Sequence, residues 1–274
     1  MDKRLRKGFL AVLAAVFLFS TALLLRQFSD NAGGEDAYGD ALSVAMQSLP
    51  EENVPLTPAP VAAGTEDGPR WVPAPIEGED PELETLAAMD LAALREVNPD
   101  VIGWILITNT RINYPLLQGQ DNDYYLKRAW DHRETSVGSV FLEQRNAADL
   151  TDYNTIVYGH NMNDGSMFAG LRKFSAQGYW EKHPYVYILS DAGVYRYEIF
   201  AAYKAPVDSV TYGLSFHQVE TKAAFLLYAL ENSRIQTEII PQEHDRILTL
   251  STCSGAGYAH RWVVQARLKM VEAE

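Results

Sequence analysis

Residues 246–253 read Arg-Ile-Leu-Thr-Leu-Ser-Thr-Cys, and this run holds the only cysteine of the 274-residue chain. Its alternation of apolar and hydroxyl-bearing side chains predicts a β-strand, because successive side chains of a strand point to opposite faces. Cys253 then lies on the more polar face, directly before a glycine-rich turn at 254–257. A buried structural thiol is one reading of this position. The polar face and the flexible exit favour a reactive thiol, which needs a proton-transfer partner and an electrophilic helper.

Histidine is the side chain best suited to exchange protons with a thiol near neutral pH. His160 stands out among the six histidines because the strand-like run 155–158 leads through a glycine directly into it. The other five stay open as alternatives. Arg261 begins the strand-like run that follows Cys253, and the short connection between them predicts adjacent strands. Its permanently charged guanidinium suits an oxyanion or a substrate carbonyl, so we expect a Cys253–His160–Arg261 site.

Composition narrows the range of partners. The chain has 23 Lys and Arg against 36 Asp and Glu, which gives a formal net charge of −13. No basic cluster follows the first residues, so nucleic acid is not expected as a partner, because phosphate binding needs clustered Lys and Arg. A single cysteine excludes an intramolecular disulfide and makes a cysteine-rich zinc site implausible. No ligand cluster indicates a metal ion, and no cofactor is expected.

The N-terminus predicts a membrane anchor. An uncharged apolar stretch over 9–25 would span about 26 Å as a helix, close to the hydrocarbon thickness of about 30 Å. The basic residues that precede it predict that 1–8 stays in the cytoplasm and the rest is extracytoplasmic. A cleaved signal peptide or a buried helix is the alternative, although no small-x-small cleavage site follows. A free cysteine in an exported protein is unusual enough to need a chemical reason.

Residues 26–80 are rich in proline, glycine and acidic side chains, which predicts a flexible extracytoplasmic stalk with at most a short helix over 37–49. We expect the catalytic domain over 81–274, beginning with a helix at 82–97. An amphipathic helix at 216–232 would pack its apolar stripe in the core. Many short strands separated by turns predict a β-barrel or a sandwich. The strand-like runs are 101–107, 111–117, 137–142, 155–158, 185–189, 194–203, 246–253 and 261–268.

Three features together resemble the sortases, which are membrane-anchored cysteine transpeptidases of Gram-positive bacteria. They are Thr-Leu-Ser-Thr-Cys at 249–253, Tyr-Gly-His at 158–160 and Arg261 on the next strand. The resemblance covers about residues 81–270, and it implies a closed β-barrel of about eight strands. Other segments resemble class B sortases in particular, whose fold adds N-terminal helices. These segments are Asn-Pro-Asp-Val-Ile-Gly-Trp at 98–104, Asp-Asn-Asp-Tyr-Tyr-Leu at 121–126 and the inserted helix at 216–232.

The resemblance implies a reaction. The Cys253 thiolate would attack the carbonyl after the threonine of a C-terminal Pro-x-Thr-type sorting signal on a secreted protein and form a thioester. Arg261 would stabilise the oxyanion. His160 would protonate the departing amine and later take a proton from the amine of a peptidoglycan precursor, lipid II. The resemblance also carries over four substrate-groove positions, namely Tyr158, Asn122, Ser251 and Thr252.

Three other functions stay open. A class B enzyme can instead polymerise pilin subunits, with a lysine as the amine nucleophile. A thiol protease would cleave the peptide without transferring it to an amine. A membrane-tethered β-barrel that only binds a partner would use Cys253 structurally. The loop at 254–260 departs from many class B members, because it lacks the acidic residue often found just after the cysteine.

Overall fold

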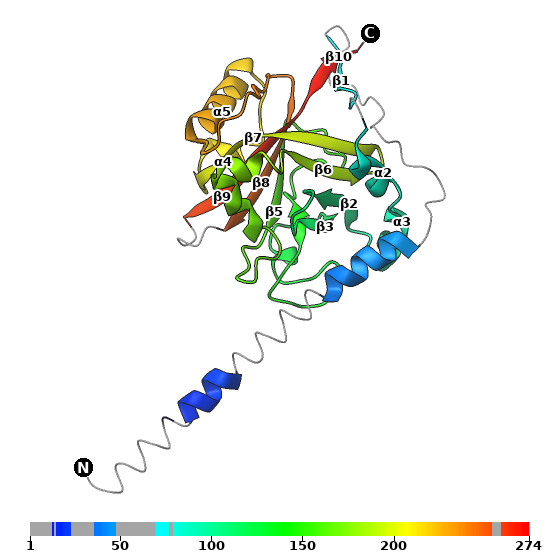
Figure 1. Ribbon diagram of the computed structural model, residues 1–274, viewed down its shortest axis with the longest axis vertical. Coiled ribbons are helices and arrows are strands. Elements are labelled where there is room, and N and C mark those ends of the chain that lie inside the picture. The colour runs from blue at the N-terminus through cyan, green and yellow to red at the C-terminus, as the bar shows by residue number, and fades with distance from the viewer. Residues whose placement is uncertain are drawn as a thin grey trace, which may run out of the picture.

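The computed structural model describes residues 13, 15–22, 36–47, 69–76, 79–253 and 259–273. Eight strands close into a barrel in the order β2-β3-β4-β5-β8-β9-β7-β6 (Figure 1). The predicted closed barrel of about eight strands is therefore confirmed. The strands are β2 Val101–Leu106, β3 Asn113–Leu117, β4 Val140–Leu142, β5 Asn154–Gly159, β6 Tyr185–Ser190, β7 Gly193–Pro206, β8 Arg246–Cys253 and β9 His260–Leu268.

Helices and one small sheet surround the barrel. A two-stranded sheet joins β1 to β10 and so ties the beginning of the domain to its end. Helix α5 packs on β7 and covers a second apolar cluster that includes Phe225 and Phe200. The bounds are β1 Trp71–Pro73, β10 Met270–Glu272, α2 Pro81–Ala87, α3 Leu91–Val97, α4 Gln177–Trp180, α5 Val219–Asn232, and the 3-10 helices η1 Tyr124–Leu126, η2 Ala169–Ser175 and η3 Val210–Tyr212.

The single helix expected over 82–97 is wrong, because this stretch forms two helices, α2 and α3. A new helix begins after Asp90, whose carboxylate accepts a hydrogen bond from the backbone N–H of Ala93 at 2.9 Å. Such a bond satisfies one of the free donors of the first turn and stabilises a helix start. The expected end of the helix is confirmed, since Asn98 is the C-terminal cap of α3.

The expected hairpin of the first two barrel strands is confirmed. Strands β2 and β3 pair in antiparallel fashion, and Asn109 lies in the connection with a φ of 57°. Asparagine tolerates this left-handed conformation better than most residues, so it suits the turn. Trp104 of β2 is fully buried in the main core. The hairpin thus contributes both a closed edge and a large core side chain.

Strand β8 is buried on both of its faces. Leu248 and Leu250 are fully buried, and so are Thr249 and Ser251. The Thr249 hydroxyl donates to Oδ1 of Asn154 at 2.7 Å and accepts from Nε2 of Gln265 at 2.9 Å. The polar face that the sequence indicates is therefore an internal hydrogen-bonded seam up to residue 251.

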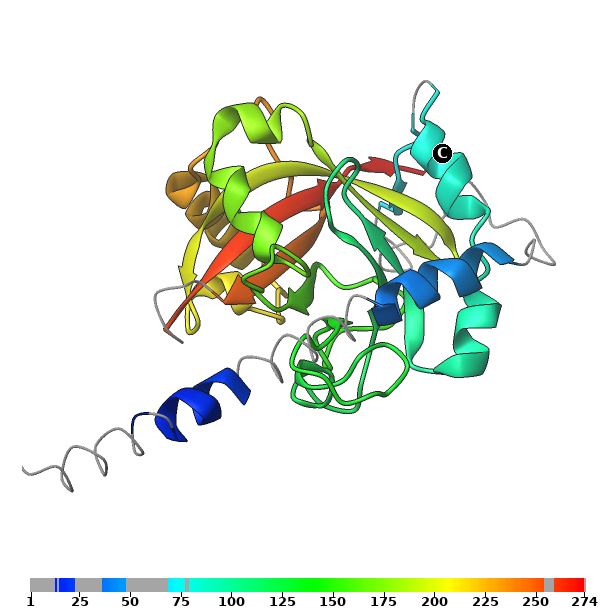
Figure 2. The ribbon, with the colours of Figure 1, turned by 60° about the horizontal axis from the view of Figure 1, so that its bottom comes forward.

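Residues 36–47 form a helix that packs on the domain (Figures 1 and 2). Ala37, Ala41 and Ala45 are almost completely buried in the main core. The helix lies within the range 26–80 in which the sequence predicts a flexible stalk, and this part of the range is docked. Much of the remaining range lies outside the described residues.

The predicted anchor over 9–25 is described only at residues 13 and 15–22, which are helical. Residues 1–8 lie outside the described part of the chain. Within the part that is described, we find no helix that combines the length and apolar character needed to cross a membrane.

Two glycine substitutions test the packing of the barrel and of the docked helix. A Cβ at Gly103 would lie 2.2 Å from the carbonyl oxygen of Leu189 on β6, so Gly103→Ala must push the two strands apart. We expect it to lower the free energy of unfolding by about 1–3 kcal/mol. Gly39→Ala places its methyl where no atom lies within 4 Å and should add about 0.5–1 kcal/mol in a helix. Chemical denaturation measures both, and equal effects of the two variants would contradict this packing.

Candidate active site

The ends of β5, β8 and β9 bring the three predicted catalytic residues together. The antiparallel register of β8 and β9 pairs Cys253 with Arg261. The parallel register of β5 and β8 pairs Gly159 with Thr252, so the next residues along these strands are His160 and Cys253. Neighbouring strands lie about 4.8 Å apart, which places the Cys253 backbone between the other two. The side chain of Cys253 lies outside the described part.

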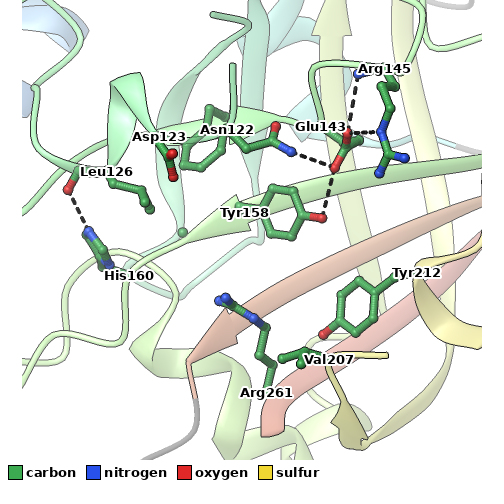
Figure 3. A pocket seen from close by; sticks show the side chains of 12 residues that line it. Asn122, Asp123, Leu126, Glu143, Arg145, Tyr158, His160, Val207, Tyr212 and Arg261 are labelled. Carbon is green, nitrogen blue, oxygen red and sulfur yellow. Dashed lines mark hydrogen bonds and ion pairs between the residues drawn. The ribbon is translucent and has the colours of Figure 1, made fainter. Parts of the chain in front are cut away.

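A pocket of about 350 Å³ opens beside these strand ends, and both His160 and Arg261 line it (Figure 3). Arg261 extends into the space that Tyr158 and Tyr212 border. The pocket therefore presents an imidazole and a permanent cation to whatever occupies it. Such a pair can exchange a proton and stabilise negative charge on an oxygen.

A backbone carbonyl fixes the His160 ring. Nε2 of His160 lies 2.7 Å from the carbonyl oxygen of Leu126. A carbonyl can only accept, so Nε2 must carry a proton in this bond, whether the ring is neutral or charged. Nδ1 is consequently the nitrogen that can gain and lose a proton. The bond selects one neutral tautomer and one ring orientation.

Gly138 packs directly against the imidazole. Its φ is +62°, and a Cβ built on it would lie 2.8 Å from Cδ2 of His160. The same Cβ would lie 2.8 Å from the carbonyl oxygen of Leu126. Only glycine combines this backbone conformation with this close approach. The ring is thus bonded to one backbone segment and in contact with another.

Glu143 forms the opposite wall of the pocket, directly after β4. Although its side chain is only 2% exposed, its carboxylate accepts three side-chain hydrogen bonds. The donors are Arg145 Nε at 2.7 Å, Asn122 Nδ2 at 2.8 Å and the Tyr158 hydroxyl at 3.1 Å. Burial alone would raise the pKa of Glu143, but the bonds from Arg145 and Asn122 outweigh it and hold that pKa below its ordinary value.

Tyr158 is kept neutral by its surroundings. Burial, and next the negative charge of Glu143, raise the pKa of Tyr158 well above the ordinary tyrosine value. Its hydroxyl therefore keeps its proton and donates it to the carboxylate. Asn122 also accepts the backbone N–H of Gln144 at 2.9 Å, so both of its polar ends are used. The pocket wall around Glu143 is consequently held by oriented hydrogen bonds.

The structure separates the four predicted substrate-groove residues. Asn122 and Tyr158 line the pocket. Ser251 is buried, and its Oγ lies 2.9 Å from the hydroxyl of Tyr212, which lines the pocket. Thr252 is also buried, and it is not among the described residues that line the pocket. Its hydroxyl finds no hydrogen-bond partner within the described part of the chain.

Sequence reasoning missed Glu143, Tyr212 and the Leu126 carbonyl. An acidic residue directly after the apolar run Val-Phe-Leu is a signal that could have indicated Glu143. The Leu126 contact uses a backbone atom, so no residue type indicates it. Among the described residues, no group of three or more His, Cys, Asp or Glu side chains could hold a metal ion.

Comparison with known proteins identifies relatives. A family model described as a sortase domain matches residues 105–269. The chain is 38% identical to sortase B of Listeria monocytogenes over 164 residues, which are 60% of this chain and 67% of the relative. It is 34% identical to sortase B of Staphylococcus aureus over the same shares. The predicted resemblance to class B sortases is therefore confirmed.

Solved structures give the same result. A Staphylococcus aureus sortase B–substrate complex matches with a TM-score of 0.62 and 32% identity, covering 67% of this chain and 85% of that one. A Bacillus anthracis sortase B in complex with AAEK1 matches with a TM-score of 0.68 and 28% identity. The second match covers 90% of this chain and all of the other.

The charge on Glu143 predicts a pH-dependent stability. Because the folded protein depresses the pKa of Glu143 below 4.5, its ionisation stabilises the fold above about pH 4.5 and less as pH falls through the folded pKa. Glu143→Gln should therefore melt at a lower temperature than the wild type near pH 7, and the gap should shrink in acid. Melting curves between about pH 3 and 8 measure this. The exposed Glu231→Gln serves as the control, and a gap that is constant with pH would contradict the prediction.

Proposed function

The chain belongs to the sortase family of cysteine transpeptidases, and we propose that Cys253, His160 and Arg261 are its catalytic residues. One observation supports this proposal above the others. The strand registers place the Cys253 backbone between His160 and Arg261, at the end of the barrel where the pocket opens. A nucleophile, a proton carrier and a cation are thus contributed by three adjacent strands.

In the first half-reaction the Cys253 thiolate forms a carbon–sulfur bond to the carbonyl carbon of the substrate threonine. The carbonyl electron pair moves to oxygen, and Arg261 stabilises the resulting oxyanion. When this intermediate collapses, the carbon–nitrogen bond breaks. Protonated His160 gives its Nδ1 proton to the departing amine, which leaves a thioester on Cys253.

In the second half-reaction an amine attacks the thioester carbonyl. His160 takes the proton of the attacking nitrogen at Nδ1, and the carbon–sulfur bond breaks to release the thiolate. A new amide joins the threonine to the acceptor, and both catalytic groups return to their first state. The bond from Nε2 to the Leu126 carbonyl persists through both halves, so only one nitrogen of His160 exchanges protons.

The proposed substrates are secreted proteins with a C-terminal Pro-x-Thr-type sorting signal, and the proposed amine belongs to a peptidoglycan precursor, lipid II. Two relatives support these ligand classes, one solved as a sortase B–substrate complex and one as sortase B complexed with triglycine. Asn122 and Tyr158, which line the pocket, are proposed as substrate contacts, with Ser251 acting through Tyr212. For Thr252 the buried position favours a supporting role.

We place the catalytic domain, residues 81–274, outside the cytoplasmic membrane, anchored by the apolar segment over 9–25 with 1–8 inside. The range 26–80 then spans the distance to the membrane, and its docked helix over 36–47 shortens the free part of that spacer.

Replacement of the thiol tests the activity. Cys253→Ala should abolish thioester formation with fluorogenic Asn-Pro-x-Thr peptides while melting like the wild type, because the nucleophile is lost and the barrel is kept. Mass spectrometry of the trapped enzyme and peptide cleavage are the measurements. Added triglycine should raise the turnover of the wild type. Cleavage by Cys253→Ala would refute the assignment, and turnover insensitive to triglycine would identify a simple protease.

A methyl at Gly138 should displace the catalytic histidine. Gly138→Ala drives a Cβ into the His160 ring, and a misplacement of about 1 Å can cost about 100-fold in rate. We expect a loss of kcat on that scale. Gly165→Ala is the matched control, because Gly165 also has a positive φ of 86° but meets only a side-chain atom of Arg111 at 3.6 Å. Equal losses in the two variants would show that backbone strain, rather than contact with His160, is the cause.

A further inference from the structure

The helix over 36–47 packs on residues 124–139, which we name the histidine-support loop because the Leu126 carbonyl within it binds His160. Trp130 of this loop is buried and donates its indole N–H to the carbonyl oxygen of Ala37 at 2.7 Å. Figure 2 shows the blue helix lying beside α3 and the green loops of this part of the chain. The helix is therefore a fixed neighbour of the loop.

Tyr38 makes a second contact with the histidine-support loop. Its ring is 8% exposed and stands edge-on to that of Tyr114, with centroids 5.0 Å apart. Its hydroxyl donates to the carbonyl oxygen of Gly138 and lies 3.2 Å from Oγ of Ser139. Burial raises the pKa of Tyr38 far above its ordinary value, so the hydroxyl keeps the proton that it donates. The Ser139 hydroxyl in turn donates to the carbonyl of Arg128 at 2.7 Å.

The residue that Tyr38 holds is the residue that meets the catalytic ring. Gly138 approaches His160 so closely that it has no room for a Cβ, and the Leu126 carbonyl lies equally close to Gly138. One hydroxyl on the helix is thus bonded to the backbone segment against which the imidazole and its acceptor are packed.

We propose that Tyr38 is a positioning residue for His160, which makes the docked helix part of the catalytic unit. The Tyr38 hydroxyl keeps the loop closed on the imidazole and keeps the Leu126 carbonyl within reach of Nε2. Without that bond the loop relaxes, and fewer molecules hold His160 in the tautomer that exchanges its proton at Nδ1. The inference rests on the proposed role of His160, and it extends the catalytic unit beyond the range 81–274.

Tyr38→Phe in the full-length chain removes only the hydroxyl and keeps the ring contact with Tyr114. Steady-state kinetics with fluorogenic Asn-Pro-x-Thr peptides and triglycine should show a kcat about tenfold lower, with KM changed by less than about twofold, because one hydrogen bond is lost away from the substrate. Correlation spectra of ¹⁵N-labelled histidine rings should show less Nε2-protonated His160. A His160→Gln sample assigns that signal.

Two variants control for the substitution and for stability. Tyr197→Phe makes the same change at a buried core tyrosine whose hydroxyl has no hydrogen-bond partner among the described residues. Ala229→Gly loosens α5, away from the loop. Both should leave kcat and the His160 signal unchanged. The proposal is overturned if Tyr38→Phe keeps both kcat and the signal, or if Ala229→Gly lowers kcat equally at the same loss of melting temperature.

Failure of the proposed function gives a different pattern. The wild type would then show no thioester and no transfer to triglycine, whatever residue occupies position 38. The histidine spectrum still decides the positioning role in that case, since it needs no substrate. An unchanged His160 signal in Tyr38→Phe overturns that role, and a shifted signal supports it.

Discussion

The parallel pairing of β5 with β8 is the constraint on which the site depends. A shift of one residue would turn every side chain of the strand to the opposite face. Asn154 opposes such a shift, since it accepts from Thr249 and donates to the backbone carbonyls of residues 211 and 213. A slipped register would leave these buried polar groups without partners, at about 1–3 kcal/mol each. The polar seam inside the barrel thereby fixes which residues meet at its end.

Backbone atoms do as much as side chains to prepare His160. Its Nε2 is bound by the Leu126 carbonyl, and its ring rests on Gly138. Backbone groups are held by the surrounding fold, so they define an orientation without the loss of side-chain freedom that a flexible partner would incur. The same feature makes the site sensitive to whatever holds the loop, including the helix over 36–47.

A buried charge organises the other side of the pocket. Removing a carboxylate from water is unfavourable unless hydrogen bonds and opposite charge compensate, and Glu143 receives both from Arg145, Asn122 and Tyr158. These bonds leave the Tyr158 phenol neutral and the Asn122 amide fixed. The groove therefore offers fixed dipoles to a peptide, with the charge of Arg145 kept at its exposed edge.

The amino-acid sequence by itself determined the strand that ends in Cys253, the Tyr-Gly-His run, Arg261 and the family, because strand alternation and motif spacing are local properties. It also indicated the barrel, through many short strands and one inserted helix. Only the tertiary structure decided what joins them: the break of the first helix at Asp90, the docking of residues 36–47, and the buried Glu143. These depend on contacts between residues far apart in the chain, and one of them, the Leu126 carbonyl, is an atom that every residue possesses. Local sequence patterns therefore identified the reacting groups, and long-range packing set their geometry.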